Sequence, residues 1–548
     1  MAAVPMPLLG SVPVLGPDET LAVTQALVKS GLIRPYRPDQ AVAIARGVLT
    51  YGLGPGVGPT VGSVVYPDEI AYIDDEGRYT FTELQASCSA VAVGLQDAGL
   101  REGERLGILG RNTVGFYLSL VGASRAGVDV GYLNTGFTAE QVADVCEREG
   151  LKAVAYDEEF AERVPASVVR IPMTPHPSGT APSVMEMAAG AARDPGKPAH
   201  RSKHIILTSG TTGRPKGAAR TGGGLDSIIA LLSGFGHETR KRHLISAPMF
   251  HAWGWSNMMF TMLLSSTIVN QRRFDPEETL AVIERERCEV LVAVPVMVQR
   301  IMGLPAEVRR RYDTSCLEKV VLSGSALSGE LANAFQDEFG DVVYNLYGST
   351  EAAFATVATP EDLRAAPGTA GRPLAGVQVR VVDDHGAEVP AGTPGSIIVG
   401  SGTSFEGYTS GEDKERIGGL VAIGDRGWFD EDGRLFVGSR DDDMVVTGGE
   451  NVYPVTVENE LVKHPDVIEA AVLGAEDREF GQVLVAHVVL KADSALNADD
   501  AGAAELRTWS KQHLAPFQVP RRIVFHSELP RNDSGKVLKR VLAEAQAD

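Results

Sequence analysis

The sequence predicts a large α/β protein with a smaller α+β domain at its carboxyl end, and three observations support this fold class. The chain has 548 residues, enough for three or four structural units of about 150 residues each. Between about residue 64 and residue 375, short apolar runs alternate with helical stretches, as in parallel sheets covered by helices on both faces. Beyond residue 441, about 105 residues have an α+β pattern of their own, which is enough for a separate domain.

The first 60 residues are expected to form an extension that wraps around the body. A proline-rich start is followed by two predicted helices, at 19–29 and 40–49. The glycine-rich run at 52–62 has no apolar strand before it and no helical pattern after it. We therefore interpret this run as a linker rather than a nucleotide loop.

The body is expected to begin with a hairpin. Apolar residues at 70–73 and 79–81 bracket a turn at 74–77, and Thr82 is expected to cap a helix over 83–98. The alternating elements that follow are predicted as strand 105–109, helix 114–126, strand 128–132, helix 139–149 and strands 204–207, 243–247, 290–294 and 319–322.

The pattern changes after about residue 375. Short alternating strands separated by turns at 383–386 and 430–433 predict a β-rich subdomain. After an acidic run at 441–443, the predicted elements are helix 457–462, strands 468–473 and 484–490, helix 503–513 and strand 522–525. The expected organisation is an extension over 1–60, a large domain over 61–440 and a small mobile domain over 441–548.

Composition disfavours several classes of protein. Hydrophobic residues make up 44% and charged residues 22%, which is typical of a soluble globular chain. The formal charge of −20 disfavours nucleic acid and anionic membranes as partners. The cysteines, Cys88, Cys146, Cys288 and Cys316, lack metal-binding spacing, so we expect neither a disulfide framework nor structural zinc. No signal pattern and no run of ~18 apolar residues is present, so a cytoplasmic location is expected.

A loop rich in hydroxyls and glycines is the strongest local signal for chemistry. It follows a predicted strand, its glycines permit close backbone approach to a ligand, and its lysine supplies a positive charge. The spacing is not that of a Walker A motif, and such a run is also typical of a flexible turn, so the residues alone leave both interpretations open. The candidate phosphate-binding residues are Thr208, Ser209, Gly210, Thr211, Thr212, Gly213 and Lys216.

Six motifs in this order resemble those of the adenylate-forming superfamily, which includes acyl-CoA synthetases, firefly luciferase and adenylation domains. They are TSGTTGRPKG at 208–217, PMFHAWG at 248–254, YGSTE at 347–351, GD at 424–425, RDDD at 440–443 running on to GENVYP at 449–454, and PRNDSGK at 530–536. The resemblance covers the chain from about residue 60. The acyl-CoA synthetase branch is the most similar, which implies fatty acids as substrates.

The resemblance implies a nucleotide site. Glu351 would bind Mg²⁺, which typically takes one or two protein carboxylates, and Thr350 would donate to phosphate. Tyr347 would pack on adenine, and Asp425 would accept both ribose hydroxyls with support from Arg440. Without the resemblance, Glu351 is typical of a solvated loop and Tyr347 of core packing. Asp425 is typical of a turn, and Arg440 of a surface ion pair. The further residues expected to line the adenine site are Gly324, Ser325, Ala326, Asn345 and Gly348.

The resemblance also implies residues for the acid. His251 would orient the substrate rather than act as a base, because a carboxylate with a pKa near 4 is already ionised at pH 7. Trp253 and Trp255 would wall the acyl pocket. Lys536 would bridge the carboxylate and the α-phosphate. The alternatives are that His251 is a core histidine whose polar atoms are hydrogen-bonded within the protein, and that Lys536 is a solvent-exposed lysine.

In the family the small domain rotates between two half-reactions. Asp442 would occupy the hinge, and Gly449 would line the channel for the pantetheine arm. A solvated acidic linker is the alternative for the run 441–443.

The predicted function is that of an ATP-dependent acyl-CoA synthetase. It would use ATP, Mg²⁺ and coenzyme A with a carboxylic acid, most simply a fatty acid. The alternatives are a ligase that loads a carrier protein and a catalytically silent nucleotide-binding sensor. The sequence leaves open the acyl chain length, a homodimer, peripheral membrane contact and the role of residues 1–60.

Overall fold

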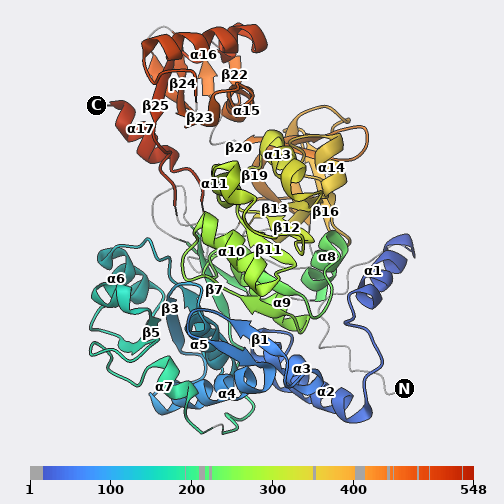
Figure 1. The fold of residues 1–548 in the computed structure, drawn as a ribbon, viewed down its shortest axis with the longest axis vertical. Helices are drawn as coiled ribbons and strands as arrows, with labels where there is room; N and C mark the ends of the chain where they lie inside the picture. The colour runs from blue at the N-terminus through green and yellow to red at the C-terminus, as the bar shows by residue number, and fades with distance from the viewer. Residues whose placement is uncertain are drawn as a thin grey trace.

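Four sheets organise the chain in the computed structural model (Figure 1). The structure describes residues 17–191, 193–208, 216–220, 225–349, 353–400, 414–440, 445–447, 450–477, 480–492, 494–532 and 535–547. The predicted fold class is confirmed: a large body of α/β sheets carries a β-rich subdomain, and a smaller α+β domain lies at one end of the molecule. Among the described residues no helix is long and apolar enough to cross a bilayer.

The largest sheet has nine strands in the order β15-β14-β13-β12-β11-β9-β10-β1-β2. Its strands are β1 (Ile70–Ile73), β2 (Arg78–Thr80), β9 (Arg242–Ile245), β10 (Thr267–Val269), β11 (Val290–Ala293), β12 (Lys319–Leu322), β13 (Val343–Ser349), β14 (Ala353–Ala358) and β15 (Arg372–Pro373). The strands from β1 to β13 in this order pair in parallel. Their carboxyl ends therefore share one edge, the usual place for ligands in open α/β sheets.

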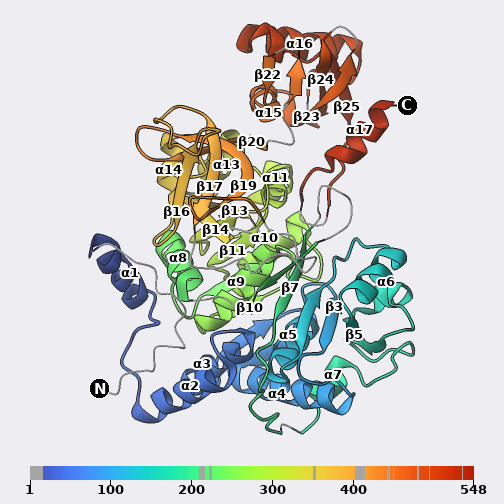
Figure 2. The ribbon, with the colours of Figure 1, turned by 180° about the vertical axis from the view of Figure 1, so that it is seen from behind.

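The second sheet has six strands in the order β6-β5-β3-β4-β7-β8 (Figure 2). Its strands are β3 (Arg105–Leu109), β4 (Asp129–Tyr132), β5 (Leu151–Tyr156), β6 (Val169–Pro172), β7 (His204–Thr208) and β8 (Lys216–Arg220). All pairs are parallel except the β7–β8 hairpin.

Helices cover and join the two sheets. They are α4 (Phe81–Asp97), α5 (Val114–Arg125), α6 (Ala139–Arg148), α7 (Val184–Ala188), α8 (Leu225–Phe235), α9 (Ala252–Leu263), α10 (Pro276–Glu286), α11 (Pro295–Met302), α12 (Ala306–Arg309), α13 (Gly329–Phe339) and α14 (Pro360–Ala365), with the short turn η3 (Glu158–Arg163). Every residue of α5 is buried, as expected of a helix that is apolar on all sides. One large core contains residues of both sheets and of most of these helices, and a second, smaller core packs α6 and η3 on the six-stranded sheet.

The predicted helix cap at Thr82 is wrong. The helix begins at Phe81, two residues before the predicted start, and Thr80 is its N-cap: the Thr80 hydroxyl accepts from the Glu83 backbone N–H, and the Glu83 carboxylate closes the capping box. Thr82 lies in the first turn, where its hydroxyl donates to the Pro67 carbonyl. The two threonines are two residues apart, so the sequence pattern alone does not separate them.

The linker predicted at 52–62 is also wrong. The N-terminal helices are α1 (Pro17–Lys29), α2 (Pro38–Tyr51), η2 (Pro55–Val57) and α3 (Gly58–Val65). Residues 55–62 are buried. A Cβ on Gly62 would lie 2.1 Å from Cδ1 of Phe81, so this glycine permits close packing of α3 on α4 rather than flexibility.

Arg125 ties this N-terminal region to the body. Its side chain is fully buried, and its Nε donates to the Gly56 carbonyl at 2.9 Å. The other nitrogens donate to the Gln85 carbonyl, the Gln85 side chain and the Ser89 hydroxyl. The guanidinium also lies over the ring of Tyr51, 5.2 Å from its centroid.

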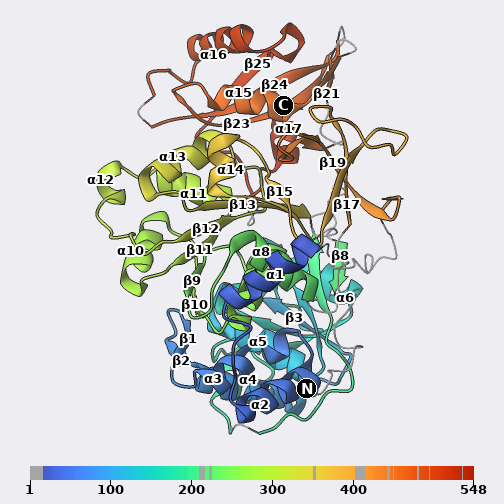
Figure 3. The ribbon, with the colours of Figure 1, turned by 90° about the vertical axis from the view of Figure 1, so that its right-hand side faces the viewer.

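The rest of the chain forms the subdomain and the C-terminal domain (Figure 3). The subdomain sheet contains β16 (Gln378–Val382), β17 (Gly395–Gly400), β18 (Arg416–Ile417), β19 (Leu420–Phe429) and β20 (Leu435–Arg440). The C-terminal domain contains β21 (Val445–Thr447), β22 (Glu450–Val452), β23 (Val467–Asp477), β24 (Gly481–Leu490) and β25 (Arg522–His526), with α15 (Pro454–Val462), α16 (Asp500–His513), η5 (Pro516–Gln518) and α17 (Lys539–Ala547). The exact domain boundaries stay predictions.

Candidate active site at the carboxyl edge of the nine-stranded sheet

Four neighbouring parallel strands bring the predicted site residues to one edge. The strands β9, β11, β12 and β13 are consecutive in the sheet. The residues at or after their carboxyl ends are His251 after β9, Val294 and Val296 after β11, Gly324, Ser325 and Ala326 after β12, and Asn345, Tyr347 and Gly348 within β13. Segments about 100 residues apart along the chain therefore meet at one place.

The turn before His251 is held by Asn112, which follows β3. The Asn112 Nδ2 donates to the carbonyls of Ile245 and Ala247 at 3.1 and 2.9 Å. Its Oδ1 accepts from the Met249 backbone N–H at 2.9 Å. All three bonds are buried, so this turn has a fixed path. We did not predict Asn112; a polar residue just after a buried strand was the available signal.

His251 is the N-cap residue of α9, and its ring lies in an apolar setting. The ring centroid is 4.5 Å from that of Phe250. Burial lowers the pKa of His251 to about 4, so the imidazole is neutral at pH 7. Its Nε2 has no hydrogen-bond partner among the described residues. Buried nitrogens normally have a partner, so this atom can bind a ligand.

Trp253 and Trp255 are buried, and both indole N–H groups are bound inside the protein. Trp253 Nε1 donates to the Ala293 carbonyl at 3.0 Å, and Trp255 Nε1 donates to the Tyr132 hydroxyl at 2.7 Å. Tyr132 belongs to the six-stranded sheet, so Trp255 links the two sheets. With their polar atoms occupied, the indoles offer neighbours only apolar surface. Their role in an acyl pocket stays a prediction.

Two of the predicted nucleotide residues are in direct contact. The Tyr347 hydroxyl donates to Oδ2 of Asp425 at 2.6 Å, which joins β13 to β19. Asp425 pairs across the subdomain sheet with Arg440. Asn345 is buried, and its Oδ1 has no partner within the described part of the chain. The adenine and ribose candidates are therefore neighbours, and one buried acceptor beside them is left for a ligand.

The lysine loop, residues 530–536, also reaches this edge. A Cβ on Gly535 would lie 2.5 Å from Cγ1 of Val296 and 3.2 Å from Cγ2 of Val294, and its φ of +79° suits glycine. A Cβ on Gly324 would lie 3.5 Å from Cγ1 of the same Val294. Lys536 follows Gly535 directly, and its backbone N–H donates to the Asn532 side chain at 2.9 Å. The loop thus lies beside the predicted adenine segment.

Several predicted residues fall outside this description. Thr208 and Lys216 are opposite each other in the β7–β8 hairpin, so the intervening loop connects two paired strands. For these two residues and Arg440 only the backbone is described. The residues that lie outside the described part are Ser209, Gly210, Thr211, Thr212, Gly213, Thr350, Glu351, Asp442 and Gly449.

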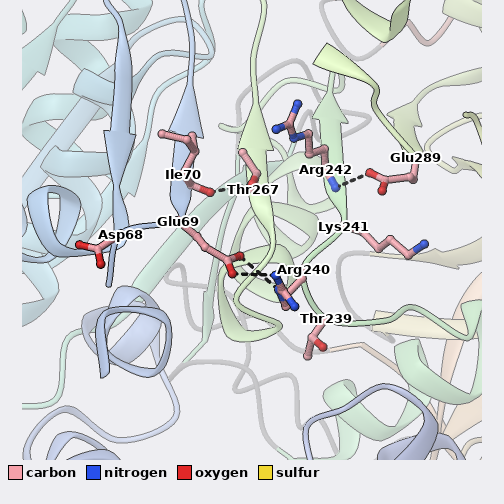
Figure 4. Close-up of a pocket in the computed structure, with 9 residues that line it drawn as sticks. All are labelled: Asp68, Glu69, Ile70, Thr239, Arg240, Lys241, Arg242, Thr267 and Glu289. Carbon is pink, nitrogen blue, oxygen red and sulfur yellow. Dashed lines mark hydrogen bonds and ion pairs between the residues drawn. The ribbon is translucent and has the colours of Figure 1, made fainter. Parts of the chain in front are cut away.

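A cavity of about 460 Å³ lies at the opposite, amino edge of the same sheet (Figure 4). It is lined by Asp68, Glu69, Ile70, Thr239, Arg240, Lys241, Arg242, Thr267 and Glu289. Arg240 pairs with Glu69 at 2.7 Å, Lys241 pairs with Glu318 at 2.6 Å, and the Arg242 backbone N–H donates to Glu289 at 2.8 Å. Most of its charged groups are thus partnered within the chain, and we place the site at the carboxyl edge.

Comparisons with known proteins identify the class of enzyme to which this fold belongs. The sequence profile described as "AMP-binding enzyme" matches residues 63–409, and that described as "AMP-binding enzyme C-terminal domain" matches residues 456–536. The chain belongs to this family, and the resemblance to adenylate-forming enzymes is confirmed. Adenylate-forming CoA ligases use ATP, Mg²⁺ and CoA.

Relatives place the chain among the CoA ligases of the family. It is 32% identical over 473 residues to a feruloyl-CoA synthase of Amycolatopsis sp, covering 84% of this chain and 92% of that protein. It is 31% identical over 486 residues to a 2-succinylbenzoate–CoA ligase of Bacillus licheniformis, covering 87% and 97%. The structure of o-succinylbenzoate CoA synthetase from Bacillus subtilis with its acyl-adenylate matches with a TM-score of 0.75 and 27% identity, covering 88% and 97%.

These comparisons support acid–CoA ligase activity in general. They do not single out the predicted fatty-acid branch: the names of these relatives specify other acids, and a further relative, 30% identical over 86% of this chain, is named a fatty acid–[acyl-carrier-protein] ligase of Streptomyces coeruleorubidus.

Proposed function

We propose that this chain is an AMP-forming acid–CoA ligase for a hydrophobic carboxylic acid. In the first half-reaction, a carboxylate oxygen forms a bond to the α-phosphorus of ATP, and the bond from that phosphorus to pyrophosphate breaks. In the second, the thiol sulfur of CoA bonds to the acyl carbon, AMP leaves, and the thiol proton is released.

One observation carries the proposal: the lysine loop meets the segment after β11, at the sheet edge where the segments after β9 and β12 and the residues of β13 also lie. His251, Gly324, Asn345 and the Tyr347–Asp425 pair come from the body and subdomain, whereas Gly535 and Lys536 come from the C-terminal domain. Joining two substrates requires their positioning in one site, and contributions from two domains suit that task.

The residues present fit a nucleotide and an acid. Asp425 would accept ribose hydroxyls, and the unpartnered Asn345 Oδ1 would accept from adenine. The neutral His251 would donate one hydrogen bond from Nε2 to the ionised carboxylate and so orient the acid without transferring a proton. Lys536 would stabilise charge that builds up between carboxylate and phosphate. The magnesium role of Glu351 and the channel role of Gly449 remain predictions.

The apolar setting of α9 favours a hydrophobic acid. Phe250, Trp253 and Trp255 are buried around the start of this helix. Phe235 adds a further ring, 6.1 Å from that of Trp253. A fatty acid was predicted from the sequence, but the feruloyl and succinylbenzoyl groups named for the relatives favour a ring-bearing acid. We therefore rank aryl acids before fatty acids.

CoA-dependent AMP release, measured across acids from acetate through palmitate to ferulate and benzoate, tests the function. We expect activity with at least one hydrophobic acid and little with acetate. Release of pyrophosphate without any transfer to CoA would favour the carrier-protein alternative. Binding of ATP without pyrophosphate release for every acid would favour the sensor alternative.

A further inference from the structure

Helix α11 connects the body to the C-terminal domain through two contacts. The side-chain Nε2 of Gln299 donates a hydrogen bond to the backbone oxygen of Ile468, in β23, at 3.1 Å. Val296, three residues earlier, lies against Gly535 of the lysine loop. Residues three apart share one face of a helix. One face of α11 therefore touches both β23 and the lysine loop, and Figure 1 shows this helix on the side of the body nearest the C-terminal domain.

Within the C-terminal domain, β23 is connected to the lysine loop. Glu469, which follows Ile468, forms an ion pair with Arg531, and Arg531 donates to the backbone oxygen of Gly535. The side chains of Glu469 and Arg531 are only 17% and 15% exposed, so solvent and salt screen this pair weakly. A continuous series of contacts thus runs from α11 through β23 to the residue before the catalytic lysine.

A like charge acts against these contacts. Burial, followed by the nearby guanidinium of Arg300, lowers the pKa of Arg531 to about 10. Arg300 follows Gln299 directly, and its side chain is exposed. The end of α11 therefore presents an attractive group and a repulsive group to the C-terminal domain at adjacent positions. Such a pairing suits an interface that must both form and separate.

We propose that Gln299 is a positioning residue that holds Lys536 at the carboxyl edge for adenylate formation and releases it for thioester formation. The inference rests on the proposed function. The Gln299–Ile468 bond joins two domains, so it exists only in this orientation of the C-terminal domain, and any rotation of that domain breaks it. Loss of the bond lowers the population of this orientation and leaves the reacting groups unchanged. The first half-reaction then slows and the second does not.

The test compares two glutamines that make the same kind of bond. Gln299→Met removes the amide and keeps the length of the side chain. Gln96→Met is the matched control. Gln96 lies on α4, at the far end of the body from the C-terminal domain, and its Nε2 also donates to a backbone oxygen, that of Pro195, at 3.3 Å. The full chain is used throughout, with ferulate and octanoate as probe acids. Pyrophosphate exchange into ATP reports the first half-reaction, and thioester formation from synthetic acyl-adenylate and CoA reports the second.

We expect Gln299→Met to slow pyrophosphate exchange about three- to tenfold, which corresponds to the loss of one net hydrogen bond. The rate of thioester formation should stay within about twofold of that of the unchanged chain. Gln96→Met should leave both rates unchanged. The ratio within one preparation does not depend on the folded fraction of a variant. Equal slowing of both half-reactions in Gln299→Met, or no slowing of exchange, would overturn the role of Gln299.

A measurement without substrate separates this inference from the proposed function. Backbone hydrogen exchange over residues 522–540 should be faster in Gln299→Met than in Gln96→Met. No difference there would overturn the positioning role, whatever the activity. If the unchanged chain supports no pyrophosphate exchange with any acid of the panel, the proposed function fails, while hydrogen exchange still decides whether Gln299 holds the loop.

Discussion

The two edges of the nine-stranded sheet differ in how the side chains of their candidate sites are partnered. At the amino edge, Arg240, Lys241 and Arg242 have acidic or carbonyl partners within the chain. At the carboxyl edge, the buried atoms His251 Nε2 and Asn345 Oδ1 have no partner within the described ranges. A cavity whose charged groups are mostly partnered has little left for a ligand, whereas buried unpartnered polar atoms are costly unless a ligand satisfies them. Among the residues that the structure describes, unpartnered buried nitrogens also occur on His237 and His243, near the amino edge. The site is therefore indicated by unpartnered atoms that lie beside the contact between Tyr347 and Asp425, and not by unpartnered atoms alone.

The largest expected contrast between the edges concerns their lysines. Lys536→Ala should lower adenylate formation by about 10²-fold or more, because a positioned charge that stabilises the transition state is lost. Lys241→Ala, at the amino edge, should leave the rate within about twofold, because it removes only a partly exposed ion pair with Glu318. Pyrophosphate release measures both. Equal losses in the two variants would contradict the assignment of the site.

A smaller contrast is expected for acidic residues. Asp425→Ala removes the acceptor of the Tyr347 hydroxyl and the proposed ribose acceptor, so KM for ATP should rise about tenfold or more. Glu69→Ala removes the partner of Arg240 and should leave KM unchanged. Steady-state kinetics with varied ATP checks both variants. An unchanged KM in Asp425→Ala would remove Asp425 from the nucleotide site.

Buried histidines near both edges should give the protein a common sensitivity to acid. Burial lowers the pKa of His243 to about 3 and that of His251 to about 4, from an ordinary value near 6.5. Between pH 6.5 and 4 the unfolded chain binds protons that the folded chain does not, so the free energy of unfolding falls as pH falls through this window. We expect Tm to drop by several degrees from pH 7 to pH 5. In His243→Gln the drop should be smaller, and an equal drop would show that other groups dominate.

The smallest effect is expected at Arg240. Its ion pair with Glu69 is about half exposed on both sides, and exposed pairs contribute about 1 kcal/mol or less. Arg240→Met should therefore change the free energy of unfolding by less than that and leave activity unchanged. Urea unfolding and the AMP-release assay measure the two quantities. A large loss of activity would mean that the amino-edge cavity communicates with the reaction.

Local patterns predicted much of the fold and part of the site. Strand β12 lies at the predicted residues, and β9, β11 and α5 differ from the predictions by one or two residues at their ends, because buried apolar runs bounded by turn residues are strong signals. The residues 55–62 were misjudged, because glycines used for packing against Phe81 look the same in sequence as glycines used for flexibility.

Other parts of the site had no local signal. The Asn112 bonds reach Ile245 and Ala247, more than 130 residues away, and the Gln299 bond reaches Ile468, 169 residues away. Such partners are set by topology, which no short stretch of sequence encodes. The motif order placed His251, Tyr347, Asp425 and Lys536 through resemblance, and their chemistry in this chain stays a prediction.

Arg125 has a consequence for anyone who shortens this chain to the stretch that matches the family profile, which begins at residue 63. Such a truncation deletes the Gly56 carbonyl and the Tyr51 ring. The buried guanidinium of Arg125 would then lose both contacts and lie next to water or an empty space. The N-terminal helices are thus part of the packed interior, and expression boundaries should be drawn outside them.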